Sequence, residues 1–373
     1  MDTVMIFGQP SWRIANEQVE AYVTETGGHL GPVTFDLGTR RVQPFFVAPW
    51  AEETLPSGID DVLRILRGDF FCMPFSDRFM PDDGFTYPPH GESATRPWRL
   101  EGVGRDGTGT QLRASMDWSI RAGKVSKTVT LIDGHCAVYT RHVVEGVEGR
   151  FSYGVHPTLK LPDEEECAFI SLSPFEVGEV CPFPFELAEA KGYQSLRTGA
   201  LFAGLSRVSR MDGSFADLSR YPARKGYEDF VMMKARDRLP FGWAAVSVPS
   251  QGFVWISLKD PRVLPLSLMW MSNGGRYYAP WNGRCTGVLG MEEAALDLPL
   301  GPAEGAMQSL SECPALQADK KLVVNTIMAV AAIPDGFERV ADVRESSSGV
   351  DVLFQNGKTV HVPLNLRFLF AAP

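Results

Sequence analysis

Hydrophobic and polar residues alternate with a period of two along much of this chain. Segments with this pattern are also rich in β-branched and aromatic residues; the clearest are residues 124–132, 136–144, 243–248 and 253–258. Side chains on a strand point alternately to opposite faces, so the pattern predicts strands that pack one face against a core. Asn356-Gly357, between two further alternating runs, predicts a β-hairpin with a type I′ turn.

Helical periodicity is scarce, and its best instance is residues 57–68, where apolar residues fall on one face and Gly68 follows. Many short strands with almost no helix predict an all-β protein, built as a large antiparallel β-sandwich or barrel. Near residue 310 a segment that resembles a connector interrupts the strand pattern, and a few strands and a hairpin are predicted after it. We therefore expect one β-sandwich domain over residues 1–310. Residues 311–373 would form a C-terminal β extension or small subdomain, or strands that complete the main sheet.

The composition restricts the classes of function. The 373 residues are 44% hydrophobic and 22% charged, with a net charge of −9, which is typical of a globular protein and unfavourable for binding nucleic acid or anionic membranes. Six scattered cysteines predict free thiols in a reducing compartment. The N-terminus lacks the features of an export signal, and the apolar run at 322–333 is too short to cross a bilayer. We expect a cytoplasmic protein whose partner is a small molecule.

The sequence predicts neither a cofactor nor a metal. Residues 102–107 match G-x-G-x-x-G, but alternation rather than a helix follows, which favours a hairpin turn over a dinucleotide site. His135 and His142 are separated by seven positions, so they fall on opposite faces of one predicted strand. The acidic run at 163–166 lacks the spacing of a calcium loop and is interpreted as a solvated turn.

One segment has an unusual composition. Residues 72–92, "CMPFSDRFMPDDGFTYPPHGE", contain too many prolines for a helix and too many aromatics for an ordinary loop. Such a rigid loop can hold polar side chains for a ligand. Together with polar residues elsewhere it gives one candidate set: Arg78, His90, His156, Asp229, Glu292 and Glu293.

This set of residues suits a sugar. Histidines and carboxylates can act as acid and base, and polar side chains can bind hydroxyl groups. The aromatic residues of 269–283, Trp270 and Trp281 among them, offer flat faces for the C–H side of a pyranose.

The order of these motifs resembles the aldose 1-epimerase (galactose mutarotase-like) family. "FFCMPFSDRF" followed by "HGE" is similar to a family loop with an arginine and a His-Gly, "GVHPTL" to its second histidine motif, and "GVLGMEE" to its late glutamate strand. "VEAYVTETGGHLGPVTFDL" resembles the first hairpin of these sandwiches. The resemblance covers roughly residues 15–300. Asp77, where the family usually has Asn, marks the chain as divergent.

The resemblance implies a role for each residue. Glu292 would be the general base toward the anomeric hydroxyl and His156 the general acid toward the ring oxygen. His90 would hydrogen-bond near that oxygen, and Arg78 and Asp229 would hold sugar hydroxyls. The reaction would exchange the α and β anomers of an aldose without a metal or cofactor, in the concave face of an antiparallel β-sandwich.

Strand alternation separates the two adjacent glutamates. Leu289 and Met291 share a face with Glu293 and are expected in the core, which leaves Glu292 on the concave face. The alternative, with Glu293 as the base, requires a bulge in the strand or a shifted match to the family motif. Two other hypotheses remain open. One is a mutarotase for a phosphorylated sugar, with Arg276 or Arg284 near the phosphate. The other is a sugar-binding protein without turnover.

Overall fold

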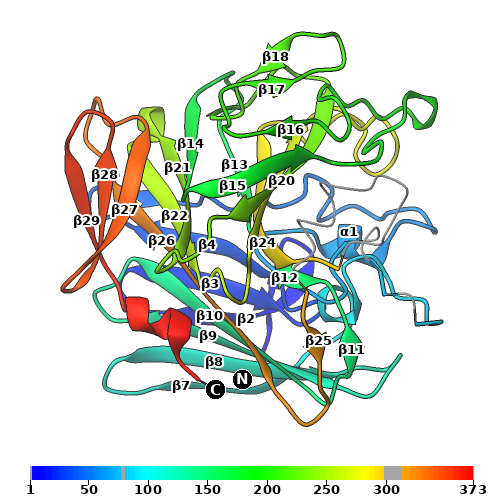
Figure 1. The fold of residues 1–373 in the computed structure, drawn as a ribbon. Helices are drawn as coiled ribbons and strands as arrows, with labels where there is room; N and C mark the ends of the chain where they lie inside the picture. The colour runs from blue at the N-terminus through cyan, green and yellow to red at the C-terminus, as the bar shows by residue number, and fades with distance from the viewer. Residues whose placement is uncertain (1, 77–79, 82, 298–312, 373) are drawn as a thin grey trace.

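The structure is a computed structural model that describes residues 2–76, 80–81, 83–297 and 313–372 (Figure 1). Within these residues the strands of each sheet pair antiparallel, and the single α-helix is the short α1 (Asp61–Ile65). The described part of the chain also contains four short 3₁₀ helices: η1 (Glu92–Ala94), η2 (Ala188–Ala190), η3 (Pro249–Gln251) and η4 (Leu366–Phe370). The predicted all-β antiparallel sandwich is confirmed.

Two large sheets form the sandwich. The first has nine strands in the order β19-β14-β21-β22-β26-β10-β9-β8-β7. Their bounds are β7 (Arg99–Arg105), β8 (Gly109–Asp117), β9 (Lys124–Ile132), β10 (Ala137–Glu145), β14 (Ala168–Leu172), β19 (Arg220–Tyr221), β21 (Gly242–Val248), β22 (Phe253–Lys259) and β26 (Leu322–Ala332).

The second sheet has eight strands, in the order β16-β15-β20-β23-β24-β12-β6 with β13 also paired to β24. Their bounds are β6 (Phe71–Cys72), β12 (Tyr153–Val155), β13 (Thr158–Lys160), β15 (Phe175–Val180), β16 (Leu201–Phe202), β20 (Tyr227–Ala235), β23 (Leu266–Asn273) and β24 (Val288–Ala295).

Smaller sheets surround these two. A five-stranded sheet holds β1 (Val4–Ile6), β2 (Gln9–Ala15), β3 (Val19–Thr24), β4 (Leu30–Asp36) and β5 (Arg41–Val42). Two strand pairs are β11 (Gly149–Arg150) with β25 (Ala315–Leu316), and β17 (Val208–Ser209) with β18 (Phe215–Ala216). A three-stranded sheet holds β27 (Val340–Ser346), β28 (Gly349–Phe354) and β29 (Thr359–Pro363).

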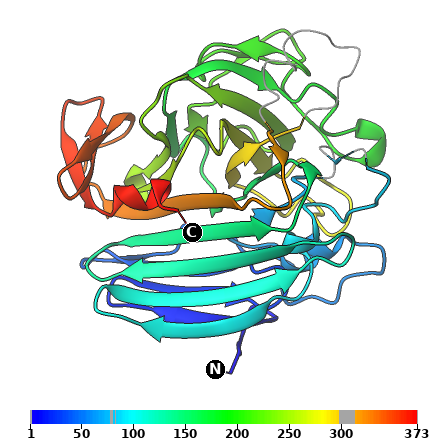
Figure 2. The same ribbon diagram turned by 60° about the horizontal axis from the view of Figure 1, so that its bottom comes forward.

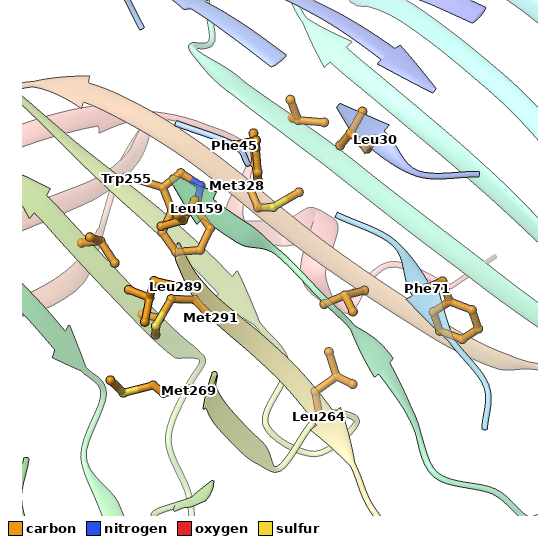
Figure 3. Packing of buried hydrophobic residues seen from close by; sticks show 14 of the residues in the cluster. Leu30, Phe45, Phe71, Leu159, Trp255, Leu264, Met269, Leu289, Met291 and Met328 are labelled. Carbon is orange, nitrogen blue, oxygen red and sulfur yellow. The ribbon is translucent and has the colours of Figure 1, made fainter. Parts of the chain in front are cut away.

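The main core lies between the large sheets. Trp255 and Met328 come from the nine-stranded sheet, and Met269, Leu289 and Met291 come from the eight-stranded sheet; all five are buried in one cluster (Figure 3). Apolar residues of β2–β4 extend this cluster against β8 and β9. The second sheet therefore has one face in the core and its other face available for a site.

The C-terminal part of the chain contributes to two different parts of the fold. Strand β26 lies inside the nine-stranded sheet, paired with β10 on one side and β22 on the other. The three-stranded sheet β27–β29 packs on the outer face of that sheet and forms a separate apolar cluster with it (Figures 1 and 2). Residues after 312 therefore both complete the main sheet and cover its outer face.

The local predictions hold with two differences. The four segments predicted from alternation correspond to β9, β10, β21 and β22, and residues 102–107 lead into a hairpin turn. The predicted helix 57–68 is confined to Asp61–Ile65, because residues 66–68 instead form backbone hydrogen bonds and a β-bridge with 46–48. The hairpin at Asn356-Gly357 forms, but a positive φ occurs at Gly357 and not at Asn356, so the type I′ prediction is wrong. Within the part of the chain that the structure describes, no helix has the length and hydrophobicity needed to cross a bilayer.

Candidate active site

A cavity of about 130 Å³ lies on the face of the eight-stranded sheet that points away from the sandwich core. Strands β20, β23 and β24 contribute to its lining, together with segments near α1 and η1. Most of the lining side chains are apolar: Val62, Leu63, Leu66, Phe70, Phe75, Phe183, Phe185, Phe230, Trp270 and Trp281. Among them stand the ionisable side chains of His90, His156, Arg276 and Glu292. Convergent ionisable groups in an apolar cavity make this the candidate active site.

Glu292 faces this cavity from β24, and its neighbour Glu293 does not. Glu293 lies in the core, where its carboxylate forms a fully buried ion pair with Lys259 Nζ. Ser267 Oγ donates a second bond to Glu293 Oε2 at 2.7 Å. The alternation of β24 thus separates the two glutamates as the sequence predicts. That Glu292 is the base stays a prediction.

His156 lies between β12 and β13, with Nε2 3.2 Å from Glu292 Oε1. Its Nδ1 is 3.1 Å from Thr158 Oγ1, whose hydroxyl donates to the His156 carbonyl at 3.3 Å. Because that hydroxyl proton is already used, we infer that Nδ1 carries the ring proton in its bond to Thr158. Neutral His156 then presents an unprotonated Nε2 toward Glu292.

The backbone and ring of His156 are also held in place. The His156 N–H donates to Asp69 Oδ1 at 3.0 Å and to the Phe70 carbonyl at 3.0 Å. The imidazole stacks on Phe70 with ring centroids 4.5 Å apart, and His29 stacks on the same ring at 4.2 Å. Asp69 is itself buried, and burial raises its pKa to about 6. These contacts fix the imidazole before any ligand arrives.

Burial moves the pKa of both partners toward the neutral form. Burial, followed by the charge of Glu293, raises the pKa of Glu292 to about 8. Burial, followed by the neighbouring His90, holds the pKa of His156 well below its ordinary value. At neutral pH the pair therefore holds one proton, on Glu292, and no net charge. The 3.2 Å approach is poorly aligned, and Glu292 Oε1 makes no hydrogen bond within the described residues.

His90 enters the cavity from the proline-rich segment after β6. Its φ of +63° is unusual for a non-glycine residue, and Gly91 follows with φ of +78°. A Cβ at position 91 would lie 1.9 Å from the Met73 carbonyl oxygen, so only glycine fits. His90 Nδ1 is 3.2 Å from Cys72 Sγ, and its ring centroid is 5.1 Å from that of His156. The tight turn thus brings the two histidines together.

Trp270 and Trp281 both line the cavity, and their expected role as a surface for a sugar stays a prediction. Their rings are 5.8 Å apart at an angle of 79°, and the Arg276 guanidinium lies 4.5 Å from the Trp281 ring. Arg276 Nε is 2.6 Å from Glu186 Oε1 and 3.9 Å from Glu228 Oε2. The charge of Arg276 is therefore compensated by two carboxylates.

The structure does not bring Asp229 to this cavity. Asp229 lies on the opposite face of β20, where its carboxylate accepts bonds from Ser195 N (2.9 Å), Ser195 Oγ (2.6 Å) and Leu196 N (2.8 Å). The cause is strand alternation, since Asp229 shares its face with core residues such as Val231. Arg78 lies outside the described residues, so its expected role stays a prediction.

The adjacent Glu228 is the residue that sequence reasoning missed. It is fully buried behind the cavity lining and accepts bonds from Trp270 Nε1 (3.2 Å), Ser272 Oγ (2.9 Å) and Gly275 N (3.0 Å). Burial raises its pKa to about 7, against the opposing effect of Arg276. Glu228 thus ties Trp270 and Arg276 together. Strand alternation could have identified Glu228, because adjacent residues of a strand face opposite sides and only one of Glu228 and Asp229 can lie toward the cavity.

Within the described residues, no group of three or more His, Cys, Asp and Glu side chains is arranged to hold a metal ion. The chemistry that this arrangement offers is acid–base chemistry by the Glu292–His156 pair. No cofactor requirement is a prediction from the sequence that activity assays must test.

Comparison with known proteins finds similar solved structures but no match by sequence. No family model matches the chain, and no curated protein matches its sequence. Among solved structures, a galactose mutarotase-like protein from Clostridium acetobutylicum superimposes with a TM-score of 0.58 at 12% identity, covering 89% of this chain and 99% of that chain. A galactose mutarotase related enzyme from Lactobacillus acidophilus gives a TM-score of 0.56 at 12% identity, covering 87% and 98%.

A third structure, a galactose mutarotase-like protein from Lactobacillus casei, gives a TM-score of 0.55 at 12% identity, covering 86% of this chain and 99% of that chain. This chain has the galactose mutarotase-like fold. The fold agrees with the resemblance found in the sequence motifs, and the low identities agree with a divergent sequence. At such identity the fold alone follows, so function has to be argued from the cavity.

Proposed function

We propose that this protein is a mutarotase that interconverts the α and β anomers of a free aldose or a close relative. The observation that carries the proposal is the 3.2 Å contact between Glu292 and His156 inside an aromatic cavity. Their pKa values move in opposite directions from the ordinary values. A carboxyl group that can accept a proton beside an imidazole that can supply one is the pair that ring opening requires.

The proton balance of the reaction closes within this pair. In the reactive form His156 carries the proton and Glu292 is a carboxylate. Glu292 removes the proton of the anomeric hydroxyl while His156 Nε2 protonates the ring oxygen, so the bond between C1 and the ring oxygen breaks and C1 becomes a carbonyl. Glu292 then holds the proton and His156 is neutral, which is the arrangement that burial favours in the free protein. After rotation about C1–C2, the reverse transfers close the ring as the other anomer.

Other cavity residues would place the sugar. His90, next to His156, would hydrogen-bond near the ring oxygen, and Trp270 and Trp281 would cover the C–H face of the pyranose. Arg78 remains the expected partner of a hydroxyl group. Asp229 is not part of this proposal, since it lies on the other face of β20.

The surroundings of the two arginines weigh against a phosphorylated sugar. Arg276 is paired with Glu186, and Arg284 with Glu53 at a partly exposed position outside the cavity lining. A phosphate would have to displace a carboxylate from either guanidinium. A neutral aldose requires no such exchange, so it is the substrate class that we propose.

Saturation-transfer NMR tests the proposal, because exchange between α and β signals is seen directly on unlabelled sugars. We expect accelerated exchange for at least one free aldose, and a loss of about 10²–10⁴-fold in His156→Ala. His361→Ala is the matched control, because His361 is exposed on β29 and bonds only to the nearby Asp351, Ser346 and Ser348 among the described residues. Binding without exchange for every sugar would favour the non-catalytic binder. Exchange limited to sugar phosphates would overturn the free-aldose proposal.

The two adjacent glutamates supply a second comparison. Glu292→Gln keeps the shape of the side chain and removes the base, so it should abolish exchange while sugar still binds. Glu293→Gln should instead lower the melting temperature, because it leaves Lys259 buried without its carboxylate, and breaking a buried pair costs about 3–5 kcal/mol. Full activity in Glu292→Gln would contradict the assignment of the base.

A further inference from the structure

A second cavity lies on the reverse face of the strand that carries Glu228. It has a volume of about 220 Å³ and is bordered by the turn between β17 and β18. Its lining includes Asp229, on the opposite side of β20 from the first cavity, and the guanidinium groups of Arg210 and Arg224. The proposed reaction uses none of these residues.

Arg210 is the unusual member of this lining. Its Nε is buried and makes no hydrogen bond within the described residues, and its side chain forms no ion pair there. A buried donor without a partner is destabilising and rare in proteins. Arg224, exposed in the same lining, stacks over Tyr227 at 4.6 Å. The cavity thus contains a guanidinium whose Nε has no hydrogen-bond acceptor among the described residues.

The acidic residues of the cavity, in contrast, have protein partners. Asp229 accepts three bonds, from Ser195 and Leu196. Asp212 accepts the backbone N–H (2.9 Å) and hydroxyl (2.6 Å) of Ser214. Asp217 accepts bonds from the N–H and hydroxyl of Ser219 in the same way. Asp212 and Asp217 are engaged in their own turns, and Asp229 is engaged by residues 195–196. The charge of Arg210 acts on Asp212 and Asp229, but within the described residues its side chain forms no hydrogen bond with them.

Apolar side chains complete the cavity. Leu196, Leu218 and Met271 all line it and are each buried. A ligand that satisfies Arg210 would therefore place a charged oxygen group at one end and carbon atoms against this apolar wall. Three aspartates nearby disfavour a dianion, so a singly charged group fits better.

We propose that this cavity binds a small aliphatic carboxylate, with its carboxylate on Arg210 and its carbon chain against Leu196, Leu218 and Met271. A guanidinium presents paired N–H donors that match the two oxygens of a carboxylate. The site is separate from the proposed sugar cavity, because the two lie on opposite faces of β20. The proposal of a carboxylate site therefore does not depend on whether the protein has mutarotase activity.

Butyrate, acetate and inorganic phosphate are suitable probes, with dissociation constants measured by ligand-observed NMR. We expect butyrate to bind several-fold more tightly than acetate, because two more methylene groups leave water, and phosphate to bind weakest. Arg210→Gln should weaken butyrate binding on the order of tenfold or more. Arg210→Lys should also weaken it, because lysine keeps the charge but cannot place a donor at Nε.

Arg207→Gln is the matched control. Arg207 lies near Arg210 in sequence, outside the cavity lining, with its guanidinium over Phe215 at 3.5 Å, and should leave binding unchanged. Unaltered melting temperatures would show that the Arg210 variants fold, as expected for a side chain that forms no hydrogen bond within the described residues. The proposal is overturned if butyrate does not bind, if Arg210→Gln binds it as the wild type does, or if phosphate binds more tightly. Displacement of butyrate by an excess of free hexose would likewise contradict a separate site.

Discussion

Glu292 and His156 are both buried, and burial acts on the pKa of a carboxyl group and of an imidazole in opposite directions. Neither pKa shift alone would make a catalyst. Together the two shifts let the pair keep one proton over a wide pH range, and that proton can lie on either residue. A proton that is held but not fixed in position suits a reaction that moves one proton forward and back.

The pH profile should report this shared proton. The pKa of Glu292 is about 8 in the folded protein, so kcat/KM is expected to fall above about pH 8 as the pair loses its proton. On the acid side a second proton must bind to His156, whose pKa is far below its ordinary value. Activity should therefore stay level from pH 7 down to pH 6. Polarimetry corrected for spontaneous mutarotation measures this, and a decline between pH 7 and 6 would show that His156 titrates normally.

The same shift predicts how stability changes with pH. The folded pKa of Glu292 lies above the unfolded value near 4.5, so its contribution to stability is complete below pH 4.5 and disappears as the pH rises through about 8. The slope from this one group is at most about 1.4 kcal/mol per pH unit. Glu292→Gln removes this pH dependence. Denaturant titrations should therefore show the free energy of unfolding of the variant increasing relative to that of the wild type as the pH rises.

Thr158 is predicted to act through His156 without touching the sugar. Thr158→Val keeps the shape but removes the oxygen that accepts the Nδ1 proton. We expect kcat to fall about tenfold, the effect of one lost hydrogen bond to a buried group, with little change in KM. Thr158→Ser should restore most of the loss. A change in KM alone would show that Thr158 contacts the sugar rather than orienting His156.

At the scale of elements, a single strand supplies both cavities. On β20, Glu228 supports the first cavity and Asp229 lines the second, because neighbouring side chains point to opposite faces. The resemblance of motifs favoured Asp229 as the sugar-binding residue, and the parity of the strand assigns the supporting role to Glu228. In β24, parity and the resemblance both point to Glu292, which is the glutamate that lines the first cavity.

Substitutions on β20 should separate the two faces. Glu228→Gln places an amide where Trp270 Nε1 and Arg276 need an acceptor, so sugar binding should weaken about tenfold. Asp229→Asn loses part of its bonding to Ser195 and should lower stability by about 1 kcal/mol without changing sugar affinity. Titration calorimetry and thermal unfolding measure the two effects. If Asp229→Asn weakened sugar binding and Glu228→Gln did not, Asp229 would be the sugar-binding residue after all.

The sequence predicted what depends on neighbours along the chain. Strands β9, β10, β21 and β22 and the separation of Glu292 from Glu293 follow from alternation, which is a local property. The predicted length of α1 was wrong because residues 66–68 pair with 46–48. Parity could have placed Glu228 on the cavity side of β20, but its bond to Trp270 on another strand could not be predicted. Contacts between distant segments have no signature in a single sequence.

At the scale of the whole molecule, the C-terminal residues connect parts of the chain that are distant in sequence. Strand β26 fills the position between β22 and β10 in the nine-stranded sheet. The sheet β27–β29 then covers an apolar surface on the outer face that includes Tyr139, Trp243 and Ile256. The two pieces stabilise the fold for different reasons, so their removal should have different effects.

Removing residues 334–373 keeps β26 and uncovers the outer face. The protein should retain its sheets but associate, because a large exposed apolar patch promotes contact between molecules. Removing residues 313–373 also deletes β26, which leaves the facing edges of β22 and β10 without partners in the middle of the sheet. We expect this shorter chain to show no cooperative unfolding transition in denaturant. Light scattering after gel filtration and circular dichroism compare the two. Cooperative unfolding of the shorter chain would mean that residues 1–312 fold without β26, and that the nine-stranded sheet closes by another route.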